Sequence, residues 1–153
     1  MKKFDIRTAT TNDISVLRGF EQKLIALERK FDAELKSSGA TYYDLEHLIS
    51  DDDSYLVVAE SSGEVIGSGY GQFRESKSCF DTGKHCYLGF IFVDDSCRGF
   101  GVAKRIMDAV CDWSEERGVN YFLLEVYSEN ETAISAYEKL GFKSLSVTME
   151  LRR

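Results

Sequence analysis

Ten residues between two predicted elements, Asp94 to Ala103, carry the pattern most directly suited to chemistry. They follow an apolar strand that ends at Val93, and two glycines and an alanine leave little side chain in the first turn of the next helix. The free N–H groups of that turn and the positive end of the helix dipole form a site for phosphate oxygens. Arg98 adds a fixed positive charge at the rim. The spacing fits neither a GxGxxG dinucleotide fingerprint nor a P-loop.

A second segment makes this pattern more specific. Arg98 to Ala103 reads Arg-x-x-Gly-x-Ala, and Asn130 to Phe142 reads Asn-x-x-Ala-x-x-x-Tyr-x-x-x-Gly-Phe. The two stretches resemble motifs of the GCN5-related N-acetyltransferases (GNAT family), the first being that family's pyrophosphate-binding motif. The strong resemblance runs from about Cys86 to Phe142, and the first eighty residues agree in the order of their elements. An ordinary glycine-rich helix start is the alternative for the first motif taken alone.

The resemblance implies acetyl-CoA as the co-substrate. In the family a bulged strand separates from its parallel neighbour, and the pantetheine arm lies in the gap; Gly89-Phe90 is where this sequence could bulge. An N–H near Phe92 or Val93 would then face the thioester oxygen. The expected cofactor contacts are Ile91, Phe92, Val93, Arg98, Gly99, Phe100, Gly101, Val102, Ala103 and Asn130.

Transfer to an amine needs two proton movements, because the amine must be neutral to attack and the departing thiolate takes a proton. Tyr137 matches the family's tyrosine, whose hydroxyl lies near the CoA sulfur, so the resemblance makes it the general acid; core packing is the alternative. Glu125 is the one charge in an otherwise apolar strand, and its spacing from Tyr137 resembles that in ribosomal-protein N-terminal acetyltransferases. We expect Glu125 to be the base. His85, Glu28, Tyr87 and a water relay are the alternatives.

The elements that must position these residues alternate between strand and helix, which predicts an α/β sheet with a right-handed crossover. By resemblance it is a GNAT-type central mixed sheet of six to seven strands, flanked by about four helices and bulged at about 86–93. The first helix should bury Leu17, Phe20, Leu24, Leu27 and Phe31. We expect strands at 4–9, 55–59, 65–73, 86–93, 121–127 and 143–151, and helices after Asp13, through Ile49, at 98–117 and at 131–140.

Composition excludes several classes of protein. The 26 acids against 19 bases give a net charge of −7, and no more than two basic residues adjoin, so a nucleic-acid footprint is absent. An acidic surface weakly attracts cations such as protonated amines. The four cysteines form no CxxC pair and only two histidines are present, so we expect no metal site. With no signal peptide and no apolar stretch of membrane-spanning length, we expect a reduced, cytoplasmic protein.

These observations predict one N-acetyltransferase domain over residues 1–153, acting on a primary amine of a small molecule or a peptide N-terminus by direct attack in a ternary complex. The alternatives are a non-catalytic acyl-CoA-binding module and a transferase of a longer acyl group. Glu28 could meet the ammonium group, and Tyr42-Tyr43 either line the acceptor site or pack the short helix. A homodimer is plausible because a strand from Lys143 offers an exposed edge.

Overall fold

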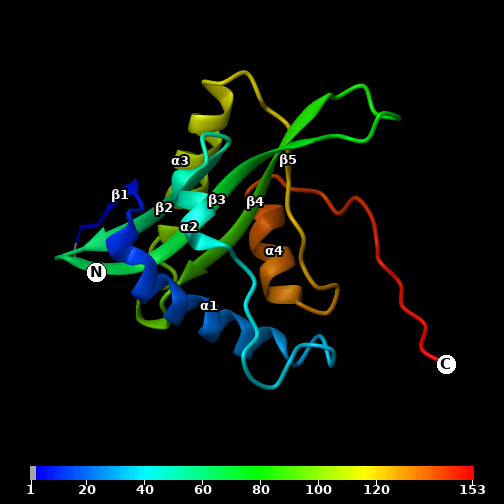
Figure 1. Ribbon diagram of the computed structural model, residues 1–153, viewed down its shortest axis with the longest axis horizontal. Helices are drawn as coiled ribbons and strands as arrows, with labels where there is room; N and C mark the ends of the chain where they lie inside the picture. The colour runs from blue at the N-terminus through cyan, green and yellow to red at the C-terminus, as the bar shows by residue number, and fades with distance from the viewer. Residues whose placement is uncertain (1–2) are drawn as a thin grey trace.

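A mixed sheet of five strands runs through the molecule in chain order. The computed structural model describes residues 3–153. Neighbouring strands are antiparallel except the last pair, which is parallel (Figure 1). The expected α/β class is confirmed, with five strands where six to seven were predicted. The strands are β1 (Asp5–Thr8), β2 (Ser54–Ser61), β3 (Glu64–Glu75), β4 (Lys84–Val93) and β5 (Phe122–Leu123).

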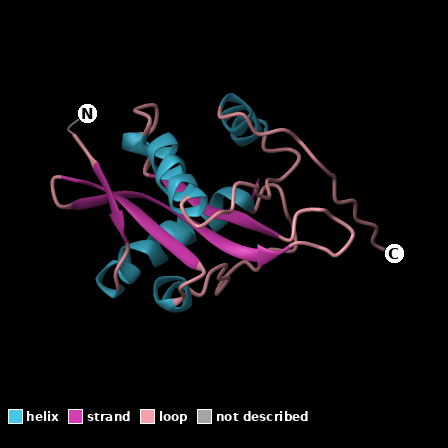
Figure 2. Ribbon diagram, turned by 90° about the horizontal axis from the view of Figure 1, so that it is seen from above, coloured by secondary structure: helices cyan, strands magenta, loops and turns pink. Residues whose placement is uncertain are grey.

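Helices cover both faces of the sheet (Figure 2). On one face α3 (Val102–Glu115) and the end of α4 (Glu131–Lys139) pack against a cluster that includes Val57 and Leu88. On the other face α1 (Ile14–Glu28) and α2 (Leu45–Ser50) pack against a second cluster. Two short 3-10 turns, η1 (Thr11–Asp13) and η2 (Asp95–Cys97), precede α1 and α3.

The helix α3 lies unusually close to the sheet because β3 presents glycines to it. A Cβ added to Gly69 would come within 2.5 Å of Ile106 Cγ2, and one added to Gly71 within 2.5 Å of Val110 Cγ1. Ile106 and Val110 are fully buried there. Side chains at either glycine would lift the helix off the sheet, so β3 fixes where the N-terminus of α3 stands.

Three predicted elements differ from the structure. The helix expected from Arg98 begins at Val102, and the strand expected over 121–127 is reduced to the half-buried β5. The strand expected over 143–151 is wrong, because residues 143–153 form no strand and are exposed throughout. Alternating apolar residues make a segment able to form a strand, but a strand also needs a neighbour for its backbone. No other segment of residues 3–153 pairs with it.

The buried face of α1 contains a carboxylate that the apolar pattern did not reveal. Leu17 and Phe20 are buried as predicted, whereas Leu27 is 45% exposed and Phe31 lies beyond the end of the helix. Glu21 occupies the buried face and is fully buried. The prediction of the buried face from apolar residues alone therefore missed Glu21, which faces the segment that follows α1.

Glu21 holds the connection between α1 and α2 in place. Its Oε2 accepts the backbone N–H groups of Tyr42 and Tyr43 at 2.9 Å each, and its Oε1 accepts Arg18 Nη1 at 3.3 Å. The α1–α2 segment (residues 29–44) contains no helix or strand of its own. The buried carboxylate thus substitutes for regular hydrogen bonding and fixes the end of this segment.

Within residues 3–153 no helix is both long enough and apolar enough to cross a bilayer.

The four cysteines are unpaired thiols, of which Cys86 is buried and Cys79 exposed.

Replacing Glu21 by alanine should lower the free energy of unfolding by about 2–4 kcal/mol, because the half-buried N–H groups of Tyr42 and Tyr43 lose their acceptor and Arg18 loses a buried partner. Urea denaturation measures the change. The matched control is Glu46→Ala, which removes the exposed carboxylate partner of the same Arg18 and should cost less than about 0.5 kcal/mol. Equal losses of unfolding free energy in the two variants would contradict the role of Glu21 in holding the α1–α2 segment.

Candidate functional site

The strand β4 carries a bulge at the position predicted for it. Between the pairs Ser68–Phe92 and Tyr70–Gly89 the strand β4 contains one residue more than β3. Phe90 takes a φ of +53°, which a residue with a side chain rarely adopts. Ser68 Oγ donates to the Phe90 carbonyl at 3.1 Å and so holds the bulge. A Cβ on Gly89 would lie 2.5 Å from the Tyr70 hydroxyl oxygen, which explains the glycine.

Beyond the bulge, β4 has no neighbour on its outer edge. It pairs with β5 only at Cys86–Phe122 and Tyr87–Leu123. From Leu88 to Val93 it continues along β3 while the chain after β5 turns away. Among the described residues, no strand pairs with this edge, so its backbone groups, apart from the Val93 carbonyl that accepts Arg98 Nε, are available to an extended polar ligand.

The open edge leads directly to a cradle of backbone N–H groups. Gly99 and Gly101 have φ values of +81° and +78°, and a Cβ on either would meet nothing within 4 Å. Gly101 is the N-cap of α3 and provides no side-chain cap. The N–H groups of the first turn therefore point out of the helix without a capping side chain. Glycine geometry, open space and the helix dipole together fit a phosphate group.

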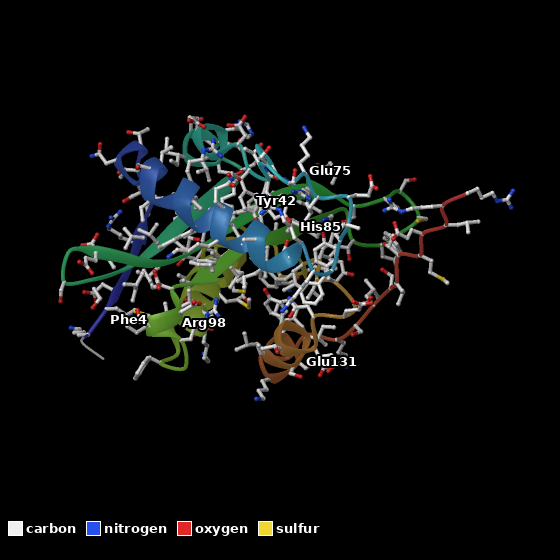
Figure 3. The ribbon with its side chains drawn as sticks, turned by 90° about the horizontal axis from the view of Figure 1, so that it is seen from below. Phe4, Tyr42, Glu75, His85, Arg98 and Glu131 are labelled. Atoms are coloured by element: carbon white, nitrogen blue, oxygen red, sulfur yellow. The ribbon has the colours of Figure 1, made fainter. Side chains whose placement is uncertain are left out.

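Arg98 connects the cradle to the end of β4. Its Nη2 pairs with Asp95 Oδ1 at 2.9 Å, and its Nε donates to the Val93 carbonyl at 3.2 Å. Figure 3 shows Arg98 at the end of the sheet near Phe4, away from His85. Its guanidinium lies between the end of β4 and η2, with one of its edges bonded to Asp95, and its contact with a phosphate stays a prediction.

Two carboxylates and two tyrosines form a cluster at the end of α1. The Tyr42 hydroxyl donates to Glu28 Oε2 at 2.7 Å, and the Tyr127 hydroxyl donates to Asp32 Oδ2 at 2.9 Å. The Phe31 ring stacks on Tyr127 with centroids 5.9 Å apart. These contacts join the α1–α2 segment to the chain that follows β5.

Glu28 and Tyr137 lie near enough to influence each other. Burial raises the pKa of the Glu28 carboxyl above its ordinary value, and the Tyr42 hydroxyl offsets part of this rise. Burial, with a smaller contribution from the Glu28 charge, raises the pKa of Tyr137. Tyr137 therefore keeps its proton through the neutral range, as a proton donor must.

Glu125 lies in the chain after β5 and is exposed. The reason for expecting base character, a lone charge in a buried strand, is wrong because β5 ends at Leu123. Its carboxylate nevertheless faces tyrosines of β3 and β4. Burial first and the Glu125 charge second raise the pKa of Tyr87 to about 12.

His85 is separated from the other candidates. It lies six residues before Ile91 on β4, about 20 Å along a strand. Its Nδ1 lies 3.0 Å from Ser76 Oγ, and burial together with the Arg74 charge lowers the pKa of His85. The structure therefore does not bring His85 to the end of β4 where the cradle lies.

Asn130 and the tyrosine pair have defined structural contacts. Asn130 Oδ1 caps α4 by accepting the Ala133 N–H at 3.2 Å, which leaves the side-chain NH2 group of Asn130 free to contact a ligand. Tyr43 stacks on the bulge residue Phe90 with centroids 4.4 Å apart, whereas Tyr42 faces Glu28. Tyr43 thus packs on the sheet, and both tyrosines line a small pocket together with His47 and Leu48 of α2.

Asp32 and Tyr127 were not predicted from the sequence. Both belong to stretches without a helical or strand pattern. They meet because the chain just after α1 lies beside the chain that connects β5 to α4. Within residues 3–153 no three His, Cys, Asp or Glu side chains are grouped to hold a metal ion.

The sequence matches the family described as the Acetyltransferase (GNAT) family over residues 22–142. It is 33% identical over 98 residues to a thialysine N-epsilon-acetyltransferase of Sus scrofa, a match that covers 60% of this chain and 57% of that protein. The chain therefore spans little more than half the length of that relative.

Solved structures share the fold over nearly the whole chain. A mutant of the BH1408 protein from Bacillus halodurans superposes with a TM-score of 0.88 at 20% identity, over 97% of this chain and 99% of that one. An aminoglycoside N-acetyltransferase in complex with CoA superposes with a TM-score of 0.76 at 23% identity, over 97% and 98% of the two chains.

Proposed function

Because the chain belongs to the GNAT acetyltransferase family, we propose that it is an acetyl-CoA-dependent N-acetyltransferase acting on a primary amine, with residues 1–153 as a single catalytic domain. The observation that best supports this proposal is that the unpaired edge of β4 ends at the N–H cradle of α3. An extended chain and a pyrophosphate, joined as they are in coenzyme A, match this sequence of features.

The donor contacts follow from this surface. Backbone groups of Ile91, Phe92 and Val93 pair with the amides of the pantetheine arm, and an N–H near Phe92 or Val93 faces the thioester oxygen. The cradle from Arg98 to Ala103 holds the pyrophosphate, and the free amide of Asn130 contacts the cofactor. Acetyl-CoA supplies the activated acyl group.

The transfer is a direct attack in a ternary complex. The ammonium group of the acceptor first loses one proton to Glu125; the neutral nitrogen then forms a bond to the carbonyl carbon, the C–S bond breaks, and the nitrogen releases its second proton to water. Tyr137 gives its proton to the thiolate, which its raised pKa supports. Glu125 accepts the proton of the amine; its exposed carboxylate beside Tyr87 is free to do so.

The acceptor is a cationic amine, and Glu28 receives its ammonium group. Glu28 and Asp32 bond the neighbouring tyrosines Tyr42 and Tyr127, and the net charge of −7 attracts cations over longer distances. The relative from Sus scrofa is named for the acetylation of a side-chain amine, which favours a small amino compound over a peptide N-terminus.

Two further expectations stay predictions. A cytoplasmic location rests on the four unpaired thiols, which suit a reducing compartment. The homodimer was expected from an exposed strand edge after Lys143; residues 143–153 are exposed but form no strand.

Gly101→Glu should weaken acetyl-CoA binding at least about a hundredfold in calorimetric titration, because a carboxylate would stand in the phosphate cradle. The matched control is Gly118→Glu at the other end of α3, where φ is +82° and a Cβ is equally unobstructed. It has the same backbone strain and should bind normally. Binding lost in both variants, or in neither, would contradict the cradle. Binding without turnover on any amine would favour a sensor module.

Tyr137→Phe should lower kcat about 10²–10⁴-fold with acetyl-CoA affinity unchanged, since only the proton donor is removed. An acid works below its pKa, and the pKa of Tyr137 is raised, so the wild-type rate should fall only above pH 10. Tyr55→Phe, at a tyrosine stacked on Trp113, serves as the control. A phenylalanine variant with wild-type kcat would refute the acid role.

Glu125→Gln and Glu28→Gln should have different effects on the steady-state constants kcat and KM. The Glu125 variant should flatten the rise of kcat with pH, whereas the Glu28 variant should raise KM for the amine about tenfold and leave kcat similar. Since the pKa of Glu28 is raised, the wild-type KM should rise with falling pH sooner than for an ordinary glutamate. The opposite assignment of the two effects would exchange the roles.

A further inference from the structure

The small pocket between α2 and β3 contains a cation that the proposed reaction does not use. The volume of the pocket is about 140 Å³. Whole ligands usually occupy pockets of about 300–1,000 Å³, so this one fits a part of a small molecule. Its polar and aromatic lining comes from the end of the α1–α2 segment, from α2 and from β3: Tyr42, Tyr43, His47, Tyr70, Gln72 and Arg74.

Arg74 is held in place without a carboxylate partner. The central carbon of its guanidinium lies 3.7 Å from the centroid of the Tyr87 ring, and its Nε donates to Gln72 Oε1 at 3.1 Å. Among the residues that the structure describes, no Asp or Glu forms an ion pair with Arg74. The contact with Gln72 uses Nε, so the two terminal NH2 groups can donate to the two oxygens of one carboxylate.

The other charged groups of the pocket already have partners. Asp44 lines the pocket, and its Oδ1 caps α2 by accepting the His47 N–H at 3.0 Å. The His47 imidazole faces Asp51, with Nε2 and Oδ2 3.7 Å apart. Arg74 is therefore the fixed positive charge that this pocket offers to an anionic group, in a chain whose net charge is −7.

Aromatic rings connect this pocket to Glu28, which receives the ammonium group under the proposed function. Tyr42 lines the pocket, and its hydroxyl donates to Glu28 Oε2 at 2.7 Å. Tyr43 contacts Tyr42 edge to face, with ring centroids 5.6 Å apart, and contacts Tyr70 in the same way at 5.8 Å. A continuous aromatic surface therefore extends from Glu28 into the pocket.

Glu125 and Arg74 lie near the same tyrosines from opposite signs of charge. Burial raises the pKa of the Tyr70 hydroxyl, the Arg74 charge lowers it, and the Glu125 charge raises it. The Tyr87 ring, on which Arg74 stacks, also feels both charges. A small molecule whose amine is near Glu125 therefore has Arg74 within reach of its other end.

We propose that Arg74 binds a carboxylate of the acceptor, so that the acceptor is an amino acid or a related amino carboxylate. This inference rests on the proposed function, because it assigns the second charged end of the amine's molecule. The carboxylate oxygens accept the terminal NH2 groups of Arg74 while Tyr87 and Gln72 hold the guanidinium. A purely cationic polyamine or amino sugar has no group for this position, and Arg74 repels its additional charges.

The phosphates of the donor are too far away to be the anions that Arg74 binds. Arg74 stands opposite His85, near the start of β4. The cradle follows the other end of β4, after Val93. The eight residues from His85 to Val93 span about 26 Å of strand, so Arg74 belongs to the acceptor and not to the pyrophosphate.

Paired acceptors test the carboxylate in steady-state kinetics, with release of the CoA thiol as the readout. The pairs are L-lysine with cadaverine, L-ornithine with putrescine, and L-leucine with 3-methylbutylamine; within each pair the compounds differ by one carboxylate. For at least one pair, wild type should favour the carboxylate compound at least about tenfold in kcat/KM, and Arg74→Gln should reduce this ratio to about one. Arg74→Lys should give an intermediate ratio, because lysine keeps the charge without the paired donors.

Arg117→Gln is the matched control. Arg117 also stacks on an aromatic ring, 4.9 Å from the centroid of Trp113, but it does not line the pocket. The control removes the same charge and should keep the wild-type ratio. A wild type that treats both members of every acetylated pair alike would overturn the proposal. A preference that survives Arg74→Gln, or that Arg117→Gln abolishes equally, would do the same.

A second measurement does not depend on turnover. Arg74 is exposed, so phenylglyoxal should modify it, and peptide mass spectrometry measures the rate at that residue. In the presence of acetyl-CoA, millimolar L-lysine, L-ornithine or L-leucine should protect Arg74 and leave Arg117 unprotected, whereas the decarboxylated partners should protect neither. Protection by none of the three would refute the carboxylate site even where amines are acetylated. Protection without thiol release from any amine would support the carboxylate site and refute the transferase function instead.

Discussion

The separation of β4 from β5 is the constraint on which the rest of this structure depends. A fully paired sheet would have no place for an extended ligand, because every backbone group of β4 would already be bonded. The bulge at Phe90, held by Ser68, ends the pairing after Tyr87 and directs the strand toward the cradle. Gly69 and Gly71 allow α3 to approach the sheet closely enough to place its N-terminus at the end of that edge.

The start of α3 and the surroundings of Glu28 differ in charge. At the start of α3 the N–H groups of the first turn have no capping side chain, and the guanidinium of Arg98 is balanced by Asp95. Glu28 and Asp32 instead bring two carboxylates together with the hydroxyls of Tyr42 and Tyr127. Under the proposed function, a polyanionic donor and a cationic acceptor are attracted to these two different places.

Local features could be predicted from the sequence, and contacts between distant segments could not. Glycines before a helix and a glycine inside an apolar strand are visible within about ten residues of sequence. The glycine-rich turn before α3 and the bulge of β4 are therefore where the sequence predicts them. Glu21 was missed because its partners, Tyr42 and Tyr43, lie in a segment without periodicity. The strand predicted from Lys143 failed for another reason, since alternation specifies a face but does not supply a neighbour.

The contacts of Glu21 hold the α1–α2 segment without depending on most of its side chains. The segment carries Asp32 and Tyr42, yet its anchorage to α1 includes two N–H groups that any residue except proline supplies. Apart from the buried Ala40 and from Tyr43, which stacks on Phe90, its side chains can therefore be exchanged with little repacking of the sheet. Under the proposed function, a chain built in this way can acquire a new acceptor through a few surface substitutions while its donor-binding half stays the same.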